Sequence, residues 1–99
     1  MFIRIGNSII NKNLIWQFIK FESSIIIIKK PMKLSVFFNP EYIISGNEFI
    51  YNNENDCSKA FEKILQDNIL NDFITEKTYT DGDFIKILKR IHEHETKSN

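Results

Sequence analysis

The residue types able to bind a metal ion gather near the carboxyl end, in His92-Glu93-His94-Glu95. On a helix, His92 and Glu95 share a face, whereas two histidines two residues apart point about 200° apart. The zinc-binding helix motif needs histidines four residues apart with a glutamate beside the first, and that spacing is absent. No second group of such ligands stands elsewhere in the sequence. We therefore expect a solvated last helical turn and no metal site.

The single cysteine, Cys57, has the chemistry of a nucleophile and also that of a small buried side chain. Its position near the expected start of a helix favours the thiolate. However, Cys57 also lies on an apolar stripe, and free cysteines are among the most buried residue types. Both histidines lie far along the chain, in the last helical segment. We expect a buried thiol without a catalytic function.

Other patterns that carry out catalysis are missing. Gly6, Gly46 and Gly82 lie far apart and form no phosphate-binding loop. A Gly-x-Ser-x-Gly elbow is also absent. Asp81 and Asp83 fall at the expected start of a helix, where carboxylates ordinarily cap the helix and interact with its dipole. The sequence therefore predicts no catalytic residue and no cofactor, and we expect a non-enzymatic protein.

The composition limits what single residues mean. The chain has 19 Ile, 11 Asn, 11 Lys and 9 Phe, but one Ala and one Val, which indicates an A+T-rich gene. The formal net charge is zero, so no overall field draws the chain to nucleic acid or to an anionic membrane. Residues 1–53 carry six basic and three acidic side chains, whereas residues 54–99 carry seven basic and ten acidic ones. Such a division marks an oriented binding surface or two layers that attract each other.

Four features of the sequence favour an intracellular, soluble protein, in the cytoplasm or in the stroma or matrix of an organelle. The longest apolar run, Ile25 to Ile28, is far shorter than the ~20 residues of a membrane span. The first residues, from Met1 to Asn7, break before a signal-peptide apolar region develops. One cysteine allows no internal disulfide, and no Asn-x-Ser/Thr glycosylation site occurs. We expect no contact with a membrane.

Apolar alternation predicts strands in the first half of the chain, and helical spacing predicts helices in the second. The expected helices lie near residues 56–70, with Asn55 or Asp56 as the N-cap, and near 83–95. Residues 73–88 fit either a hairpin turning at Asp81-Gly82 or the start of the second helix, and the helix formers of 86–95 favour the helix. The expected strands are 2–5, 8–10, 14–21, 25–29, 32–38, 42–44 and 48–51.

These elements predict one α+β domain, with a β-rich part in residues 1–53 and a helical part in 54–99. We expect an antiparallel β-meander of four to six strands, in which strands 14–21 and 32–38 are central. Two C-terminal helices follow the meander and pack on one face of the sheet.

The strands carry more apolar surface than one helical layer covers. Both faces of strand 14–21 are apolar, as are both faces of the run Ile25 to Ile28. In one interpretation the second sheet face or an exposed sheet edge binds a partner, either a second copy of this chain or another protein. In the other, the same chain covers that face. Under the first interpretation the interface residues are Trp16, Phe18, Phe21 and Phe37, and the chain is a small interaction protein, a homo-oligomer such as a homodimer or a subunit of a larger assembly.

Single-stranded nucleic acid is the alternative partner. Sheets that bind single strands combine basic side chains with exposed aromatic ones on which bases stack. A strand-rich half followed by a helix is similar in outline to the single-strand-binding proteins of the Whirly family, without shared motif residues. Lys29 and Lys30 also flank an aggregation-prone isoleucine run, where charges oppose sheet extension. The expected nucleic-acid contacts are Arg4, Lys20, Lys29, Lys30 and Lys33.

Overall fold

The computed structural model describes the backbone of residues 1–30, 32–34, 41–43 and 45–97, and the side chains of residues 1–30, 45–80, 83 and 85–93. Within these residues the chain forms two helices, α1 (Glu54–Asp67) and α2 (Asp81–Lys97), and one 3₁₀ turn (Lys12–Leu14). The strands are β1 (Phe2–Ile5), β2 (Ser8–Asn11), β3 (Ile15–Phe21), β4 (Ser24–Lys29), β5 (Met32–Leu34), β6 (Glu41–Ile43), β7 (Ser45–Ile50), β8 (Ile69–Leu70) and β9 (Thr75–Thr80).

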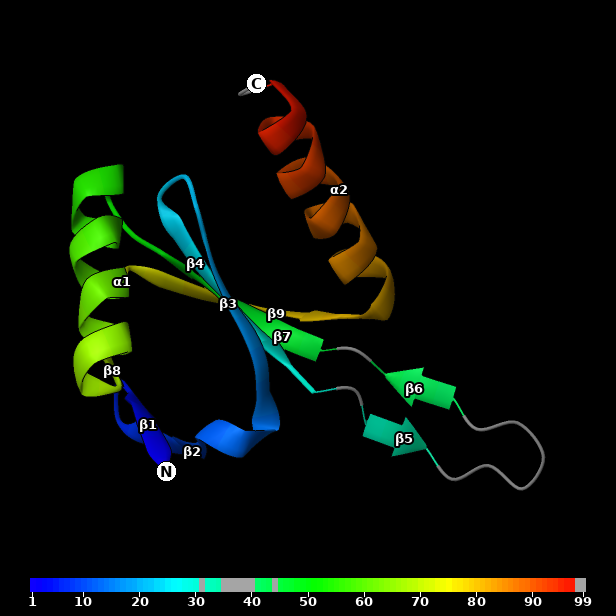
Figure 1. Cartoon of the computed structure of the whole chain (residues 1–99), viewed down its shortest axis with the longest axis horizontal. Coiled ribbons are helices and arrows are strands. Elements are labelled where there is room, and N and C mark those ends of the chain that lie inside the picture. Colours follow the sequence, from blue (N-terminus) through cyan, green and yellow to red (C-terminus); the bar gives the residue numbers. More distant parts are fainter. Residues whose placement is uncertain (31, 35–40, 44, 98–99) are drawn as a thin grey trace.

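The largest sheet has the strand order β3-β4-β7-β9, and all its neighbouring strands are antiparallel. A smaller sheet has the order β2-β1-β8, in which β1 and β8 are parallel. The pair β5-β6 lies between β4 and β7 in sequence and extends away from the larger sheet (Figure 1). The expected α+β class and the antiparallel meander are therefore confirmed in outline.

Local sequence explains most of the turns and ends. Gly6 has a φ of +56°, a conformation that a residue without a Cβ adopts at no steric cost, and it turns β1 into β2. Asn53, rather than the expected Asn55 or Asp56, is the N-cap of α1, because its side chain accepts a hydrogen bond from the Asp56 backbone N–H. Asn68 ends α1 in the left-handed conformation, and Ile69 therefore lies in β8 and not in the helix.

The two helices lie on opposite faces of the larger sheet, and β8 and β9 separate them in sequence (Figure 1). Ile25 and Ile27 of β4 belong to the core cluster that contains Cys57 and Ile64 of α1. Ile26 and Ile28 belong to a second cluster with Ile87 and Ile91 of α2. The prediction of two C-terminal helices on one face was therefore wrong. Successive residues of a strand point to opposite faces, so four consecutive isoleucines require cover on both.

The positions of the strands also differ from the prediction. β4 and β7 are the central strands of the larger sheet, whereas β3, expected to be central, is an edge strand. Among the described residues, Met32–Leu34 pairs with β6 and with no strand of the larger sheet, and the rest of the expected strand 32–38 lies outside these residues. The other edge is β9, Thr-Glu-Lys-Thr-Tyr-Thr, which the sequence analysis missed because polar residues dominate it. The hairpin considered for residues 73–88 is thus a strand followed directly by a helix.

We predict that Ile26→Ala and Ile27→Ala each lower the free energy of unfolding by about 2–5 kcal/mol, because each removes a fully buried side chain from a different cluster. Ile85→Ala, at a site 58% exposed, is the matched control and should change stability by less than about 1 kcal/mol. Chemical denaturation measures all three. A small effect of Ile26→Ala would contradict the burial of that face under α2.

Candidate interaction surface

The two edges of the larger sheet differ in how far they resist pairing with another strand. An exposed edge strand offers unpaired backbone groups to other chains, and proteins oppose this with charged or polar edge residues. β9 carries Glu76, Lys77 and three threonines. β3, Ile-Trp-Gln-Phe-Ile-Lys-Phe, has Lys20 as its one charged residue. The β3 edge is therefore the less protected of the two.

The hydrogen-bond pattern identifies the backbone groups that β3 directs outward. The Tyr51 N–H donates to the Ser23 oxygen at 2.9 Å, so the backbone groups of Ser23 face β7. The backbone N–H and C=O groups of successive residues in an antiparallel strand point to opposite neighbouring strands. Those of Ser24 therefore point to β3, where Ser24 pairs with Phe21. By the same alternation, Phe18 and Lys20 direct their N–H and C=O groups away from β4. Within the described residues, no strand of the sheet lies on that side of β3.

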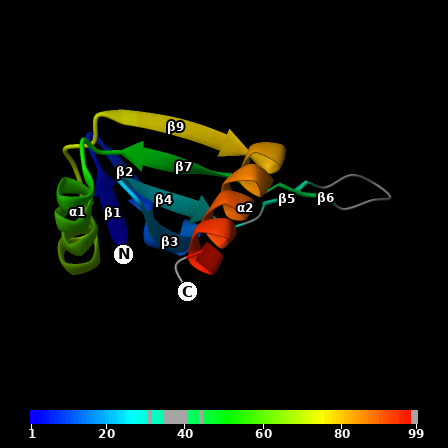
Figure 2. The ribbon, with the colours of Figure 1, turned by 90° about the horizontal axis from the view of Figure 1, so that it is seen from above.

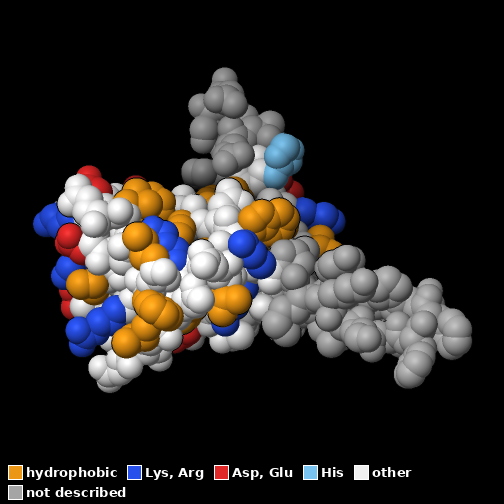
Figure 3. Space-filling model, turned by 60° about the horizontal axis from the view of Figure 1, so that its bottom comes forward, with side chains coloured by type: hydrophobic (Ala, Val, Ile, Leu, Met, Phe, Trp, Pro, Cys, Tyr) orange, Lys and Arg blue, Asp and Glu red, His pale blue; other side chains and the backbone are white. Residues whose placement is uncertain are grey.

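Trp16 lies at the amino end of this edge. The register of β3 against β4 shifts between Ile15 and Gln17, so Trp16 is an extra residue, as in a β-bulge. Its side chain is 62% exposed, and that of the neighbouring Leu14 is 58% exposed. Met1, Phe2 of β1 and Ile9 of β2 are also large apolar side chains that are strongly exposed. Figure 3 turns the side that holds β1 and β2 forward, and apolar side chains there lie beside basic ones.

Of the four aromatic residues expected at an interface, Trp16 alone is strongly exposed among those described. Phe18 is half-buried and packs against the core cluster under α1. Phe21 is buried in the cluster under α2, because α2 covers the face to which it points. Phe37 lies outside the described residues. The sheet face considered for binding is therefore largely covered by the chain itself, and the open surface is an edge.

A buried carboxylate helps to hold α2 on this face. Glu48 of β7 is 4% exposed, and its Oε1 accepts a hydrogen bond from the Tyr79 hydroxyl at 2.6 Å. Its Oε2 lies 3.8 Å from Arg90 Nη2 of α2, and the Arg90 guanidinium lies 5.0 Å from the centroid of the Phe21 ring. Removing a carboxylate from water is costly unless donors surround it, so this network fixes where α2 can sit. Burial, and then the hydrogen bond to Glu48, raise the pKa of Tyr79 to about 12.

The basic residues expected to contact nucleic acid do not form one described surface. Arg4 is on β1, where its Nε donates to the Gly6 oxygen, and Lys20 on β3 donates to the Glu22 oxygen. Lys29 is half-buried at the end of β4, and the exposed Lys30 donates its backbone N–H to the Leu14 oxygen. Lys33 falls among the residues without a described side chain. Of the four whose side chains are described, Lys29 and Lys30 adjoin the Trp16 end of β3.

The residues considered for chemistry lie apart from each other where their side chains are described. Cys57 is buried in α1, and burial raises the pKa of its thiol, which opposes thiolate formation. His92 lies on the outer side of α2, in a shallow depression of about 540 Å³ with Ile85 and Leu88. His94 and Glu95 have no described side chains. No group of three His, Cys, Asp or Glu side chains able to hold a metal ion occurs among the described residues.

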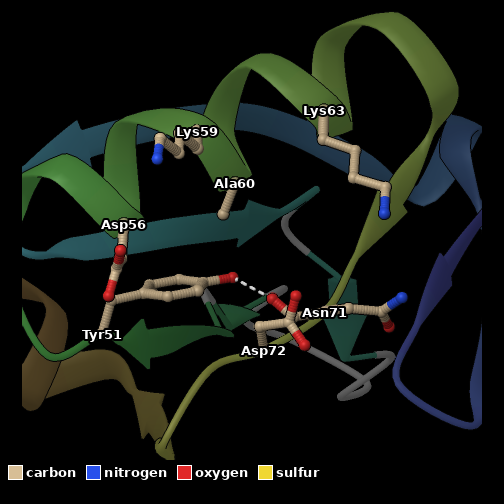
Figure 4. Close-up of a pocket in the computed structure, with 7 residues that line it drawn as sticks. All are labelled: Tyr51, Asp56, Lys59, Ala60, Lys63, Asn71 and Asp72. Atoms are coloured by element: carbon tan, nitrogen blue, oxygen red, sulfur yellow. Dashed lines mark hydrogen bonds between the residues drawn. The ribbon is translucent and has the colours of Figure 1, made fainter.

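A pocket of about 310 Å³ lies between α1 and the segment after β8 (Figure 4). Tyr51 forms its floor and donates a hydrogen bond to the Asn71 oxygen at 2.7 Å, and burial raises the pKa of this tyrosine. Two lysines and two aspartates line the pocket, and all four are exposed to solvent. Their opposite charges partly cancel, so none of them provides the desolvated charge that orients a ligand. The full lining is Tyr51, Asp56, Lys59, Ala60, Lys63, Asn71 and Asp72.

No family model, no curated protein and no solved structure matches this chain. Among the described residues, no helix is long and apolar enough to cross a membrane. The candidate surface therefore depends on the geometry of β3 and Trp16.

We predict that Tyr79→Phe lowers the free energy of unfolding at neutral pH by about 1–3 kcal/mol, because it removes a donor from the buried Glu48 carboxylate. The folded state raises the pKa of Tyr79 above its ordinary 10.0, so the stabilisation is complete below pH 10 and is lost as the pH rises toward 12. Denaturation across this range should show a smaller loss of stability in Tyr79→Phe than in the parent. Equal losses would contradict the role of the Tyr79 hydroxyl.

We also predict that Cys57 in the native protein resists alkylation at neutral pH, because the thiol is buried and its pKa is raised. The rate should approach that of a free thiol only when denaturant unfolds the chain. Mass spectrometry of timed samples measures both rates. Rapid modification of the folded protein would overturn the assignment of Cys57 to the core.

Proposed function

We propose that this chain is a small non-enzymatic interaction protein that acts as a homo-oligomer or as a subunit of a larger assembly. It binds its partner through the open edge of β3 and the exposed Trp16 beside it. The main support is the exposure of Trp16, 62%, at the end of an edge strand with one charged residue. A tryptophan and an unpaired strand edge supply the two components of strand addition, namely an apolar anchor and backbone hydrogen bonds.

Single-stranded nucleic acid is the second candidate, because the Lys30 backbone bonds to Leu14, two residues from Trp16. An exposed indole beside basic side chains can stack on a base. The zero net charge weighs against this candidate, as does the separation of Arg4 on β1 from Lys29 at the end of β4. Binding of a labelled oligonucleotide at about 50 mM salt, lost at higher salt, would favour it over a protein partner.

We predict that a photoreactive amino acid at position 16 crosslinks to protein far more efficiently than one at position 74. Ile74 is the matched control, because it is 58% exposed but lies immediately before β9, the opposite edge of the sheet. The probe is introduced in the cells that make the protein, and mass spectrometry identifies the crosslinked peptides. Crosslinks of a specific protein at position 16 alone support the proposal. Equal crosslinking at both positions, or none at position 16, contradicts it.

A further inference from the structure

The β3 edge has the properties of a surface that pairs with its own copy. We infer that two copies of this chain join by antiparallel pairing of β3 with β3, which unites two four-stranded sheets into one of eight strands. This inference rests on the proposed function and names the partner of the same surface. A dimer with a two-fold axis uses one surface twice, so a single unprotected edge is sufficient to form it.

The backbone of β3 provides the hydrogen bonds for such pairing. Phe18 and Lys20 direct their N–H and C=O groups outward and lie two residues apart, which is the spacing at which an antiparallel neighbour forms its pairs of bonds. The bulge at Trp16 interrupts the regular ladder at the amino end. The pairing segment therefore extends from about Gln17 to Phe21, a usual length for a strand contact.

The side chains of β3 are complementary to themselves in an antiparallel arrangement. An axis at Lys20 would place two lysines directly opposite each other, which destabilises a sheet. An axis at Ile19 instead pairs the segment Gln17 to Phe21 with itself and sets each Lys20 across from Phe18 of the other copy. A cation beside an aromatic ring stabilises such a contact. Trp16 lies next to the paired segment, at its amino end. The zero net charge adds no overall repulsion between two copies.

The opposite edge explains why growth stops at two copies. β9 carries Glu76 and Lys77, and Asn47 Nδ2 donates to Glu76 Oε1 at 2.7 Å, which holds this edge in a polar, hydrogen-bonded arrangement. A charged edge opposes further strand addition. One protected and one open edge therefore favour a closed dimer over a continuous sheet.

Matched proline variants test this dimer. Lys20→Pro removes an outward N–H from β3 and leaves the pairing with β4, since proline is tolerated where the N–H of an edge strand faces solvent. Thr78→Pro makes the same change at the outward-facing N–H of β9. Light scattering and sedimentation should give a dimer for the parent and for Thr78→Pro and a monomer for Lys20→Pro. Should Lys20→Pro fail to fold, Gln17→Lys is the second variant. Gln17 is exposed, so the new lysine adds a charge to the same edge and should also give a monomer.

Distances between spin labels identify which edge is in contact. Labels on Gln17→Cys should lie about 15–20 Å apart across the dimer, because the two sites are four residues of about 3.4 Å apart along strands separated by about 4.8 Å. Labels on Thr78→Cys should lie about 34 Å apart, the width of seven strand spacings. The buried Cys57 stays unlabelled in the folded protein.

A monomeric parent at micromolar concentrations, a dimeric Lys20→Pro or a short Thr78 distance would each overturn the inference. Crosslinking at position 16 to a different protein, with a monomeric parent, would overturn this dimer while the proposed function stands. An absence of crosslinking at position 16 would remove both.

Discussion

Burial of four consecutive isoleucines in β4 is the constraint on which the rest of the structure depends. Ile25, Ile26, Ile27 and Ile28 are each at most 5% exposed, and because a strand alternates its side chains, two of them point to each face. The sheet therefore needs cover on both sides. α1 and the small sheet supply it on one face, and α2 supplies it on the other, as the edge-on view of Figure 1 makes clear.

This cover requires a long path for the chain. After α1 has covered the first face, β9 carries the chain along the far edge, and α2 then crosses the second face from β9 toward β3 (Figure 2). Ile87 and Ile91 supply the apolar contact of α2, and the Glu48 network gives it a fixed position. β9 is thus both an edge strand and the connection that takes the chain to the opposite face. In consequence β3 keeps one side open.

The sequence predicted the features that depend on local pattern and missed those that depend on distant contacts. The hairpin at Gly6, both helices and the burial of Cys57 follow from turn chemistry and helical spacing. The sequence also showed apolar residues on both faces of the strands in the first half of the chain. One of the two interpretations of this excess was that the same chain covers the second face. The placement of α2 on that face depends on Glu48, Tyr79 and Arg90, which lie far apart in sequence and carry no joint signal. The polar β9 showed too little apolar alternation to be recognised as a strand.

The central claim is that the β3 edge beside Trp16 becomes covered when the protein associates. Trp16 is the only tryptophan of the chain, so its fluorescence reports on this site alone. We predict emission typical of a water-exposed indole in dilute protein. As the concentration rises, the emission should shift to shorter wavelength and acrylamide quenching should weaken. Neither change should occur in Lys20→Pro. Emission and quenching of Trp16 that stay constant over a concentration range in which the mass increases would contradict this claim.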